Sequence, residues 1–325
     1  MTQRSASNAI RRLVADLPDA TETDAPLGAL TTYRVGGSAA VLVRADSMRH
    51  LAAVARCRAY ASPGLSVLGL GSNVLVADRG VTCVVVVLAN GFSDVRFESG
   101  GVMRAGARAQ LPVVARASVE EGLAGFEWAV GVPGSVGGAV SMNAGGHGSD
   151  IAASATRIRV YDFESGEDKW MDSKALGFGY RHSSLVAHLV VIEAEFQLIP
   201  GDPAAGREQL RDIVRWRRDN QPGGHNAGSV FANPPGDSAG RLIDAAGLKG
   251  LRIGTAEVST KHANFIQADP DGRATDVYEL IRAVRDRVAD AHGVSLGLEN
   301  RLAGFTAHER MAVGLEALPA GVCIG

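Results

Sequence analysis

The stretch "GVPGSVGGAVSMNAGG", residues 131–146, contains six glycines within sixteen residues. Glycine loses more conformational freedom on folding than any other residue, so such a cluster indicates unusual backbone angles or a close approach to another group. A surface loop or a tight sheet corner would account for the pattern equally well. Other features of the sequence are needed to distinguish a structural turn from a binding site.

The composition excludes several classes of protein. The chain has 325 residues, of which 46% are hydrophobic and 21% are charged, and its formal net charge is −2. These values are typical of a soluble globular protein of two or three domains. The small net charge argues against a nucleic-acid footprint or a polybasic membrane patch. The apolar run "CVVVVLA" at 83–89 is far too short to span a bilayer.

The cysteines and the N-terminus indicate the compartment. The N-terminal segment is polar and has no hydrophobic signal core. Cys57, Cys83 and Cys323 lie far apart, without the spacing of a metal site or a disulfide framework. We therefore expect a cytoplasmic protein with reduced thiols and no bound metal. The oligomeric state cannot be predicted from the sequence.

The chain divides into segments of different composition. We expect an N-terminal arm at 1–27, loose apart from a short helix around "NAIRRLVADL". Short strands dominate 28–200, in two subdomains of about 28–90 and 91–200, and the composition changes after Pro200. An α+β domain follows at 201–305, and the tail at 306–325 carries no interpretable pattern.

Periodicity and boundary residues predict the main elements. Strands are expected at 40–45, 81–87 and 189–199. Helices are expected after Asp46 or Ser47, from Pro112 to near Gly122, at 207–222, over "AGRLIDAAGLKG" and at 276–292.

A second glycine-containing turn, "GLGSNV" at 69–74, does not fit a Rossmann motif. That motif needs a third glycine and a helix directly after the turn, whereas Val74, Leu75 and Val76 are typical of a strand. The sequence instead predicts a strand–turn–strand with Gly71, Ser72 and Asn73 at its tip. Such a turn can bind an anion through its backbone N–H groups, although a plain hairpin turn is an open alternative.

Two glycine-rich turns in one domain favour a diphosphate-containing cofactor. "GVPGSVGG" offers consecutive backbone amides with few side chains in the way, and Ser141 and Asn143 add polar groups. A P-loop lysine motif, which would indicate a nucleoside triphosphate, is absent from the sequence.

Three downstream segments contain candidate catalytic residues. "FGYRHSS" (178–184) holds Tyr180 and Arg181, "NAGSVFANPPG" (226–236) holds Ser229, and "LGLENRLAGF" (296–305) holds Glu299 and Arg301. Each also has a plain structural explanation: a loop-capping arginine, a turn serine outside any G-x-S-x-G elbow, and a solvent-facing charged pair. A carboxylate on an inward face would instead indicate function.

Several motifs in one order resemble a single family. "TTYRVGGSA", "GLGSNVLV", "GVPGSVGGAVSMNAG", "FGYRHSS", "AGSVFANPPG", "AGRLIDAAGLKG", "EVSTKHANFI" and "LENRLAGF" closely resemble the UDP-N-acetylenolpyruvoylglucosamine reductase family over roughly 28–305. The resemblance implies an α+β fold with an FAD-binding domain of the vanillyl-alcohol-oxidase (PCMH) type in two subdomains, plus a C-terminal substrate domain. It also implies non-covalent FAD, NADPH as the electron donor, and reduction of UDP-N-acetylglucosamine enolpyruvate to UDP-N-acetylmuramate for peptidoglycan.

The same resemblance suggests roles for individual residues. Arg181, Ser229 and Glu299 match the family's catalytic positions, with Ser229 as proton donor. The expected substrate contacts are Tyr180, Asn233 and His262. The expected cofactor contacts are Tyr33, Gly69, Gly71, Ser72, Asn73, Gly131, Gly134, Ser135, Gly138, Asn143 and Arg301. The chain resembles the short form of the family, without a tyrosine-bearing insertion after 189–199, which leaves open what covers the substrate.

Two other functions remain possible at this stage. An FAD-dependent sugar-lactone or hydroxy-acid oxidase on the same fold would reduce oxygen, but it leaves the set of Arg181, Ser229 and Glu299 unexplained. A non-catalytic nucleotide-binding module leaves the same residues without a purpose. Flavin colour and its response to NADPH distinguish the three.

Overall fold

The computed structural model describes residues 3–61, 64–319 and 321–324, and the chain forms two compact units. The first unit comprises Met1–Glu22, Leu42–Leu70 and Val84–Arg217. The second comprises Thr23–Val41, Gly71–Cys83 and Arg218–Gly325. The chain passes between them within the strands β1 (Thr21–Ala25), β2 (Ala39–Ala45) and β5 (Val81–Leu88), after Leu70, and within the helix α5 (Pro203–Asn220). The compact units are therefore not linear segments, unlike the domains expected from the sequence.

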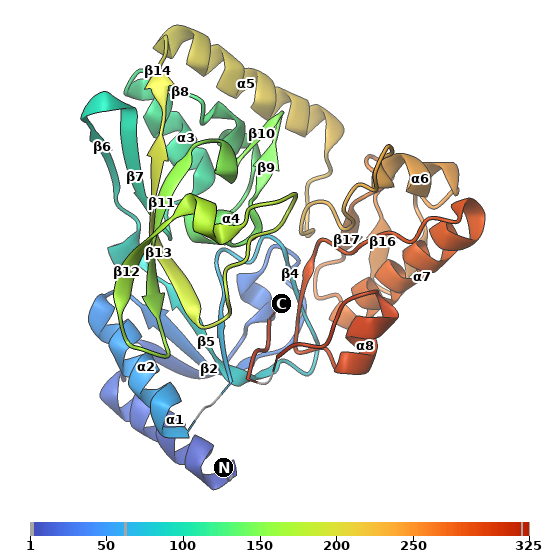
Figure 1. Ribbon diagram of the computed structural model, residues 1–325. Coiled ribbons are helices and arrows are strands. Elements are labelled where there is room, and N and C mark those ends of the chain that lie inside the picture. Colours follow the sequence, from blue (N-terminus) through green and yellow to red (C-terminus); the bar gives the residue numbers. More distant parts are fainter. Residues whose placement is uncertain (1–2, 62–63, 320, 325) are drawn as a thin grey trace. The chain divides into compact units, whose positions relative to one another are not determined.

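A five-stranded antiparallel sheet lies at the centre of the first unit, in the order β12-β11-β13-β7-β6 among the described residues (Figure 1). Its strands are β6 (Val95–Glu98), β7 (Val102–Gly106), β11 (Ala155–Asp162), β12 (Asp168–Asp172) and β13 (Leu189–Gln197). The middle strand β13 is buried from its first residue to Phe196. Its apolar sequence explains why it takes the central position, with a neighbour on each side.

The buried carboxylate of Glu195 in β13 is neutralised by arginines from the neighbouring strands. Arg157 reaches Glu195 at 2.6 Å and Arg104 reaches it at 3.0 Å. Both guanidinium groups also lie over the Trp170 ring, at 5.1 Å and 5.5 Å from its centroid. The pairing offsets the desolvation of a carboxylate in a core strand.

Helices pack around the sheets of the first unit and on one another. They are α1 (Gln3–Asp16), α2 (Met48–Ala61), α3 (Leu111–Glu120), α4 (Val136–Met142) and most of α5 (Pro203–Asn220). The short helix α4 contacts β13 and β7 of the central sheet, and α1 packs on α2. The Phe126 ring lies 4.9 Å from that of Phe196 and ties the loop after α3 to the sheet.

The N-terminal arm is more ordered than expected. The predicted helix is present as α1, where Ala9 and Leu13 are buried, but the following residues form the strand β1. This strand joins a four-stranded sheet with the order β1-β2-β5-β3 in the described chain, where β3 (Leu65–Val67) runs parallel to β5. The expectation of a loose arm was wrong because the strand's sequence, "TETDA", has no apolar alternation to reveal it.

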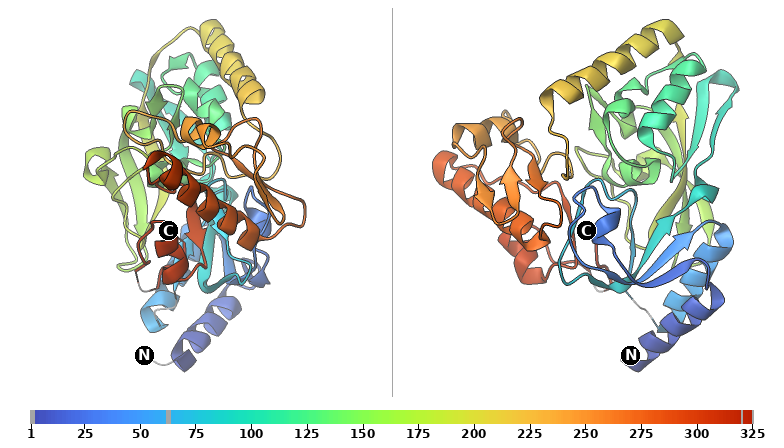
Figure 2. Two further views of the ribbon diagram at one scale, coloured as in Figure 1. Left: turned by 90° about the vertical axis from the view of Figure 1, so that its right-hand side faces the viewer. Right: turned by 180° about the vertical axis from the view of Figure 1, so that it is seen from behind.

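In the second unit, helices pack on a small antiparallel sheet. The sheet is β15 (Arg252–Ile253), β16 (Ala256–Val258) and β17 (Ile266–Ala268). The long helix α7 (Ala274–His292), coloured orange-red in Figure 2, packs against all three strands. Its apolar face is buried, as the helical spacing predicts, through Val277, Leu280, Ile281, Val284 and Val288. The helix α6 (Ala239–Ala245) packs against α7.

The N-terminal segments of the second unit join its core. β18 (Arg301–Ala303) pairs in parallel with β4 (Val74–Val76), so the chain around residue 75 lies beside the chain around residue 302. Tyr33, Val35 and Leu75 pack in the same hydrophobic core as α6 and α7. The tail contributes α8 (Ala307–Ala312) and a bridge from Ile324 to Ala303.

The predicted strand–turn–strand with Gly71, Ser72 and Asn73 at its tip exists, but it is not a hairpin. β3 pairs with β5 and β4 pairs with β18, so the two strands belong to different sheets. The other short elements are η1 (Gly28–Leu30), η2 (Asn90–Phe92), η3 (Ser99–Gly101), β8 (Leu123–Ala124), η4 (Glu127–Gly131), β9 (Gly145–Gly146), β10 (Ser149–Asp150), η5 (Ile151–Ala153), η6 (Ser173–Leu176) and β14 (Ile199–Pro200).

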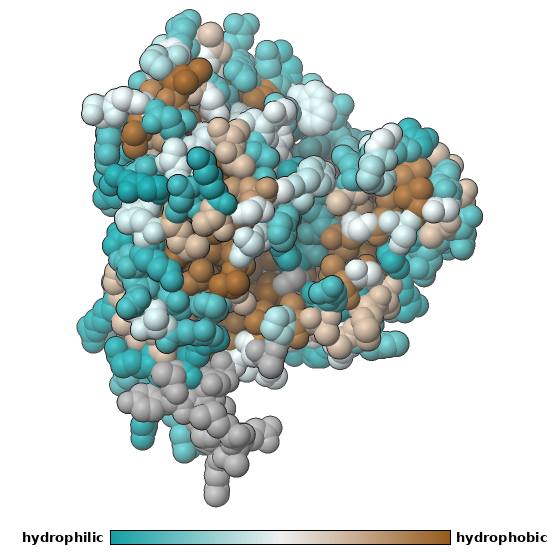
Figure 3. Space-filling view, viewed as in Figure 1, coloured by the Kyte–Doolittle hydropathy of each residue, from teal (hydrophilic) through white to brown (hydrophobic). Residues whose placement is uncertain are grey.

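Hydrophilic side chains cover most of the face shown in Figure 3, with smaller hydrophobic areas between them. Within the described residues, no helix combines the length and the hydropathy that a membrane span requires. The same residues contain no group of three or more histidine, cysteine or acidic side chains that could hold a metal ion.

Candidate functional site

Gly69 and the glycine turn around Ser135 and Gly138, all in the first unit, lie side by side. A Cβ atom added to Gly69 would lie 3.1 Å from Ser135 Oγ and 3.7 Å from Gly138 Cα. Backbone bonds hold the 134–137 segment against the residues before α3, from Leu111 N to Gly134 O at 3.0 Å and from Gly137 N to Ala107 O at 2.9 Å. The fold therefore brings together two bare backbone segments that are remote in sequence.

The glycines of this turn have different surroundings. A Cβ on Gly137 would lie 2.9 Å from Ala107 Cβ, so Gly137 permits close packing. Gly138 is exposed, and an added Cβ would meet only Ser135 Oγ, at 3.5 Å. Ser135 itself caps α4 by accepting a hydrogen bond from Gly138 N at 3.3 Å. Gly138 is thus the glycine whose open face can receive a ligand.

Gly131, also predicted to contact the cofactor, is buried. Its added Cβ would lie 2.9 Å from Ile213 Cγ2 and 3.0 Å from the His147 ring. The absence of a side chain at this position is explained by packing within the first unit.

Arg181 also belongs to the first unit. It follows Tyr180, which is 60% exposed, in a turn closed by the bridge between Gly179 and His182. Arg181 Nη2 donates to Gly145 O at 2.8 Å, and the guanidinium carbon lies 5.0 Å from the Tyr180 ring centroid. The guanidinium is half-buried and fixed against the protein backbone.

In the second unit, Asn73 connects the turn at 71–73 to the strand β18. Its Nδ2 donates to Glu299 O at 3.1 Å, and its carbonyl oxygen accepts from Arg301 N at 2.9 Å. Gly71 has a φ of +66°, and an added Cβ would lie 2.5 Å from Leu30 O. This turn needs glycine for its backbone angle and for the close approach of residue 30.

Ser229 and Glu299 lie on neighbouring backbone segments. Glu299 N donates to Val230 O at 2.8 Å, and Phe231 forms an antiparallel bridge with Leu298. Both candidate side chains are half-buried. The structure thus brings together Ser229 and Glu299, which are seventy residues apart in sequence.

Asn300 organises this arrangement, and the sequence analysis missed it. Its side chain is 1% exposed and donates to Asn73 Oδ1 at 2.7 Å and to Ser229 O at 3.2 Å. Its Oδ1 accepts from the Tyr33 hydroxyl at 3.3 Å. The available signal was a polar residue within the apolar run "LGLENRLAGF", between the candidate residues Glu299 and Arg301.

The predicted cofactor contact of Tyr33 does not fit its position. The side chain is 0% exposed, it packs in the core of the second unit, and burial raises the pKa of its hydroxyl. Its polar atom is used by Asn300. We therefore assign the Tyr33 side chain to packing.

A pocket of about 330 Å³ opens beside Ser229 in the second unit. Asn233 and His262, both predicted to contact substrate, contribute to its wall together with Asn264. The charged lining residues are Arg241, Asp244, Lys249 and Lys261, which together carry more positive than negative charge. Arg241 is paired with Asp237, and Lys249 is paired with Asp244 at 2.7 Å. Such a wall suits an anionic ligand.

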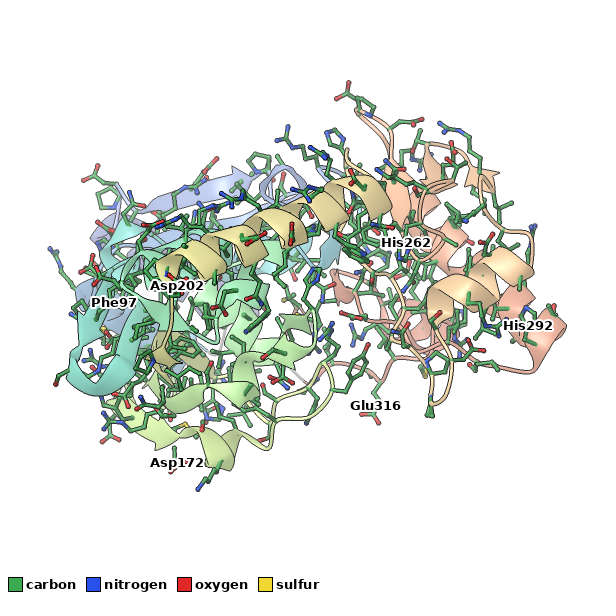
Figure 4. The ribbon with its side chains drawn as sticks, turned by 90° about the horizontal axis from the view of Figure 1, so that it is seen from above. Phe97, Asp172, Asp202, His262, His292 and Glu316 are labelled. Atoms are coloured by element: carbon green, nitrogen blue, oxygen red, sulfur yellow. The ribbon has the colours of Figure 1, made fainter. Side chains whose placement is uncertain are left out.

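His262, labelled in Figure 4, lies in the connection between β16 and β17. Its Nδ1 accepts from Asn264 N at 3.2 Å, and burial lowers the pKa of the imidazole. The neutral ring then carries its proton on Nε2 and offers a hydrogen bond without a charge. Asn264, which the sequence analysis also missed, pairs with the backbone N and O of Phe231 at 2.9 Å and 2.8 Å.

Two family models match the chain. One, described as UDP-N-acetylenolpyruvoylglucosamine reductase, C-terminal domain, matches residues 220–303, and one described as FAD binding domain matches residues 39–170. Their order along the chain agrees with the expected arrangement, in which a cofactor domain precedes a substrate domain.

Curated relatives and a solved structure extend the similarity over most of the chain. UDP-N-acetylenolpyruvoylglucosamine reductase from Rubrobacter xylanophilus is 40% identical over 289 residues, covering 88% of this chain and 96% of the relative. The same enzyme from Halalkalibacterium halodurans is 40% identical over 278 residues, covering 84% of this chain and 91% of the relative. The crystal structure of the enzyme from Thermus caldophilus matches with a TM-score of 0.75 at 36% identity, covering 85% of this chain and 97% of the other.

Proposed function

Because this chain belongs to the UDP-N-acetylenolpyruvoylglucosamine reductase family, we propose that Arg181, Ser229 and Glu299 carry out its chemistry. The chain is an FAD-dependent oxidoreductase that reduces UDP-N-acetylenolpyruvoylglucosamine with electrons from NADPH, in peptidoglycan precursor synthesis. The same family membership favours the reductase over the oxidase considered as the alternative. The predicted cytoplasmic location is proposed on the same basis, because the nucleotide-linked reactants are cytoplasmic metabolites.

The observation that carries the cofactor assignment is the contact between the two glycine stretches. Gly69 and Gly138 leave the backbone without side chains beside an open face, which fits the close approach of a diphosphate. We propose that Gly69, Gly134, Ser135 and Gly138 hold the FAD diphosphate. The family resemblance also suggests cofactor contacts for Gly71, Ser72, Asn73 and Arg301, which belong to the second unit. When bound, FAD supplies the two electrons, as a hydride, to the terminal carbon of the enolpyruvyl group.

Arg181 is proposed to bind the substrate carboxylate. Adding a hydride to the terminal carbon places negative charge on the neighbouring carbon and its carboxylate. A guanidinium stays protonated and grips a carboxylate with two parallel hydrogen bonds. Because Arg181 is half-buried and already held against Gly145, little reorganisation is needed when that charge develops.

Ser229 is proposed to donate the proton that completes the product. The carbon beside the carboxylate becomes a strong base, and a serine hydroxyl close to it can protonate it despite being a weak acid. Glu299, whose backbone is bonded to the residue after Ser229, can donate a hydrogen bond to the substrate carboxylate in its protonated form. The anchoring of both segments by Asn300 keeps the donors in place.

The pocket beside Ser229 is proposed to take the nucleotide part of the substrate. Arg241, Lys249 and Lys261 supply positive charge for a diphosphate, and Asn233 and His262 supply neutral hydrogen bonds. Tyr180 is also proposed to contact substrate, because its ring is exposed beside Arg181.

The experiment that tests this function is an anaerobic titration. Purified protein should be yellow, NADPH should bleach it, and UDP-N-acetylglucosamine enolpyruvate should restore the colour without oxygen. Colour restored only by oxygen would identify an oxidase, and protein that cannot be loaded with flavin would identify a non-catalytic binding module.

A further inference from the structure

Arg181 lies at the tip of a turn whose conformation is unfavourable for its residue type. Gly179 N donates to His182 O at 3.0 Å, and His182 N donates to Gly179 O at 3.2 Å. Between them, Arg181 has a φ of +53°, in the left-handed region that favours glycine. A side chain keeps such an angle at a functional site only where its surroundings impose it. The neighbours of the turn therefore determine where the guanidinium lies.

Asn143 contacts the base of this turn. It ends α4 with a φ of +45°, and its side chain is 2% exposed. Its Nδ2 donates to Gly179 O at 2.9 Å and to Asp150 Oδ2 at 3.0 Å, while its Oδ1 accepts from Ala152 N at 3.0 Å. A primary amide has two N–H protons, and both are used here within the protein. Asn143 therefore has no side-chain N–H left to donate to a cofactor, which was its predicted role.

The residues on either side of Asn143 contact the same turn. Ser183 Oγ donates to Ser141 O at 2.8 Å, and Arg181 Nη2 donates to Gly145 O at 2.8 Å. The end of α4 thus holds the turn at its backbone base, at its following residue and at the guanidinium itself. These contacts come from residues 141, 143 and 145, at and just beyond the end of α4.

We propose that Asn143 is a positioning residue for Arg181 and not a ligand of FAD, an inference that rests on the proposed role of Arg181. The helix that Asn143 ends begins at the turn of Ser135 and Gly138. One helix of seven residues thereby fixes the separation between Arg181 and the glycine turn. Displacement by about 1 Å is enough to lower a rate by about 100-fold in a positioned site.

The test uses Asn143→Gly, because glycine adopts the left-handed angle without strain and removes the whole amide. Asp150→Ala is the matched control: it removes one bond to Asn143 and the cap on Ala153 N, but leaves the bond from Asn143 to Gly179 O. Hydrogen exchange of the FAD-loaded proteins reports on the amide of His182. Asn143→Gly should speed its exchange by at least about tenfold, and Asp150→Ala should leave it within about twofold. Unchanged exchange in Asn143→Gly would overturn the proposal.

The two half-reactions then separate the positioning role from a general loss of structure. Asn143→Gly should keep its FAD and its rate of reduction by NADPH, while reoxidation by the enolpyruvyl substrate slows by about 10–100-fold. In an Arg181→Ala background, Asn143→Gly should add no further loss. A fully additive loss, or loss of FAD from Asn143→Gly alone, would contradict the proposal. If exchange rises but neither Asn143→Gly nor Arg181→Ala slows reoxidation, the positioning stands and the proposed role of Arg181 fails.

Discussion

The glycine turn of the first unit and the Ser229 loop of the second present their functional groups in opposite ways. Around Gly138 the side chains are absent, and the backbone itself faces outward. Around Ser229 the side chain is the functional group, and buried amides hold the backbone behind it, from Asn300 and from Asn264. A bare backbone can bind any suitably placed diphosphate, whereas a proton donor has to be held at one position. The following predictions test this difference.

Ser229→Ala should have the largest effect. The variant should bind FAD and accept electrons from NADPH at near the parental rate, because no substrate carbon is protonated in that step. Reoxidation by the enolpyruvyl substrate should slow by about 10²–10⁴-fold, the usual contribution of a general acid. Ser229→Cys should recover part of the rate, since a thiol is a stronger acid of similar size. Anaerobic stopped-flow absorbance measures both steps, and equal slowing of both would show that Ser229 is structural.

Asn300→Ala should destabilise the second unit and slow the same step. It leaves Asn73 Oδ1, the Ser229 carbonyl and the Tyr33 hydroxyl without their present partner. Unsatisfied buried polar groups cost about 1–3 kcal/mol each, so a loss of about 2–4 kcal/mol in the free energy of unfolding is expected after partial relaxation. Urea unfolding measures it. Tyr33→Phe, which removes only the 3.3 Å bond, should cost no more than about 1 kcal/mol; equal losses in the two variants would contradict the central position of Asn300.

Gly137 and Gly138 provide a matched pair within the glycine turn. Gly138→Val should fold normally but bind FAD at least about tenfold more weakly, because its side chain enters the open face. Gly137→Ala places its methyl group 2.9 Å from Ala107 Cβ and should cost about 1–3 kcal/mol of stability through overpacking. Flavin fluorescence titration and thermal unfolding measure the two quantities. A fully loaded Gly138→Val protein would remove this turn from the cofactor site.

The smallest expected effect is on the pH dependence of the free energy of unfolding, through Glu195 in β13. The hydrogen bonds from Arg157, with those from Thr156 and Arg104, lower the pKa of Glu195 from 4.5 to about 2. Since the folded state holds the carboxylate charged, its contribution is complete above about pH 4.5 and is lost as the pH falls toward 2. Glu195→Gln should therefore cost about 1–2 kcal/mol at pH 7, with solvent screening included, and the difference from the parent should shrink below pH 4.5.

Urea unfolding of both proteins between pH 3 and 7 checks this. The loss caused by Asn300→Ala serves as a contrast, because amides do not titrate and its size should stay constant over the same range. A Glu195→Gln difference that is the same at pH 3 and pH 7 would contradict the assigned cause.

Strong local patterns were sufficient to predict part of the structure. The apolar spacing along 276–292 predicted α7 (Ala274–His292), and the β-branched run at 81–87 predicted β5 (Val81–Leu88). The motifs around Gly138, Arg181 and Ser229 predicted the family, which the relatives and the family models confirm.

Features that depend on remote partners could not be predicted. The strand after Asn73 pairs with residues 301–303, which no local pattern indicates, so the turn before it was considered as a possible hairpin. Asn300 and Asn264 look like surface amides in the sequence, and only burial shows their function. The role of Asn143 could not be predicted for the same reason, because its three side-chain hydrogen bonds are made to residues up to 36 positions away.

The central claim is that this chain reduces an enolpyruvyl group by adding a hydride and then a proton from a group in exchange with solvent. Turnover of the FAD-loaded protein with NADPH and UDP-N-acetylglucosamine enolpyruvate in D₂O tests it most directly, with the product examined by mass spectrometry and proton NMR. The account predicts a deuterium on the carbon that carries the ether oxygen. The adjacent methyl group then has no proton on that carbon to couple to, so its signal is no longer split into a doublet. A product with hydrogen at that carbon, or no reduced product at all, would contradict it.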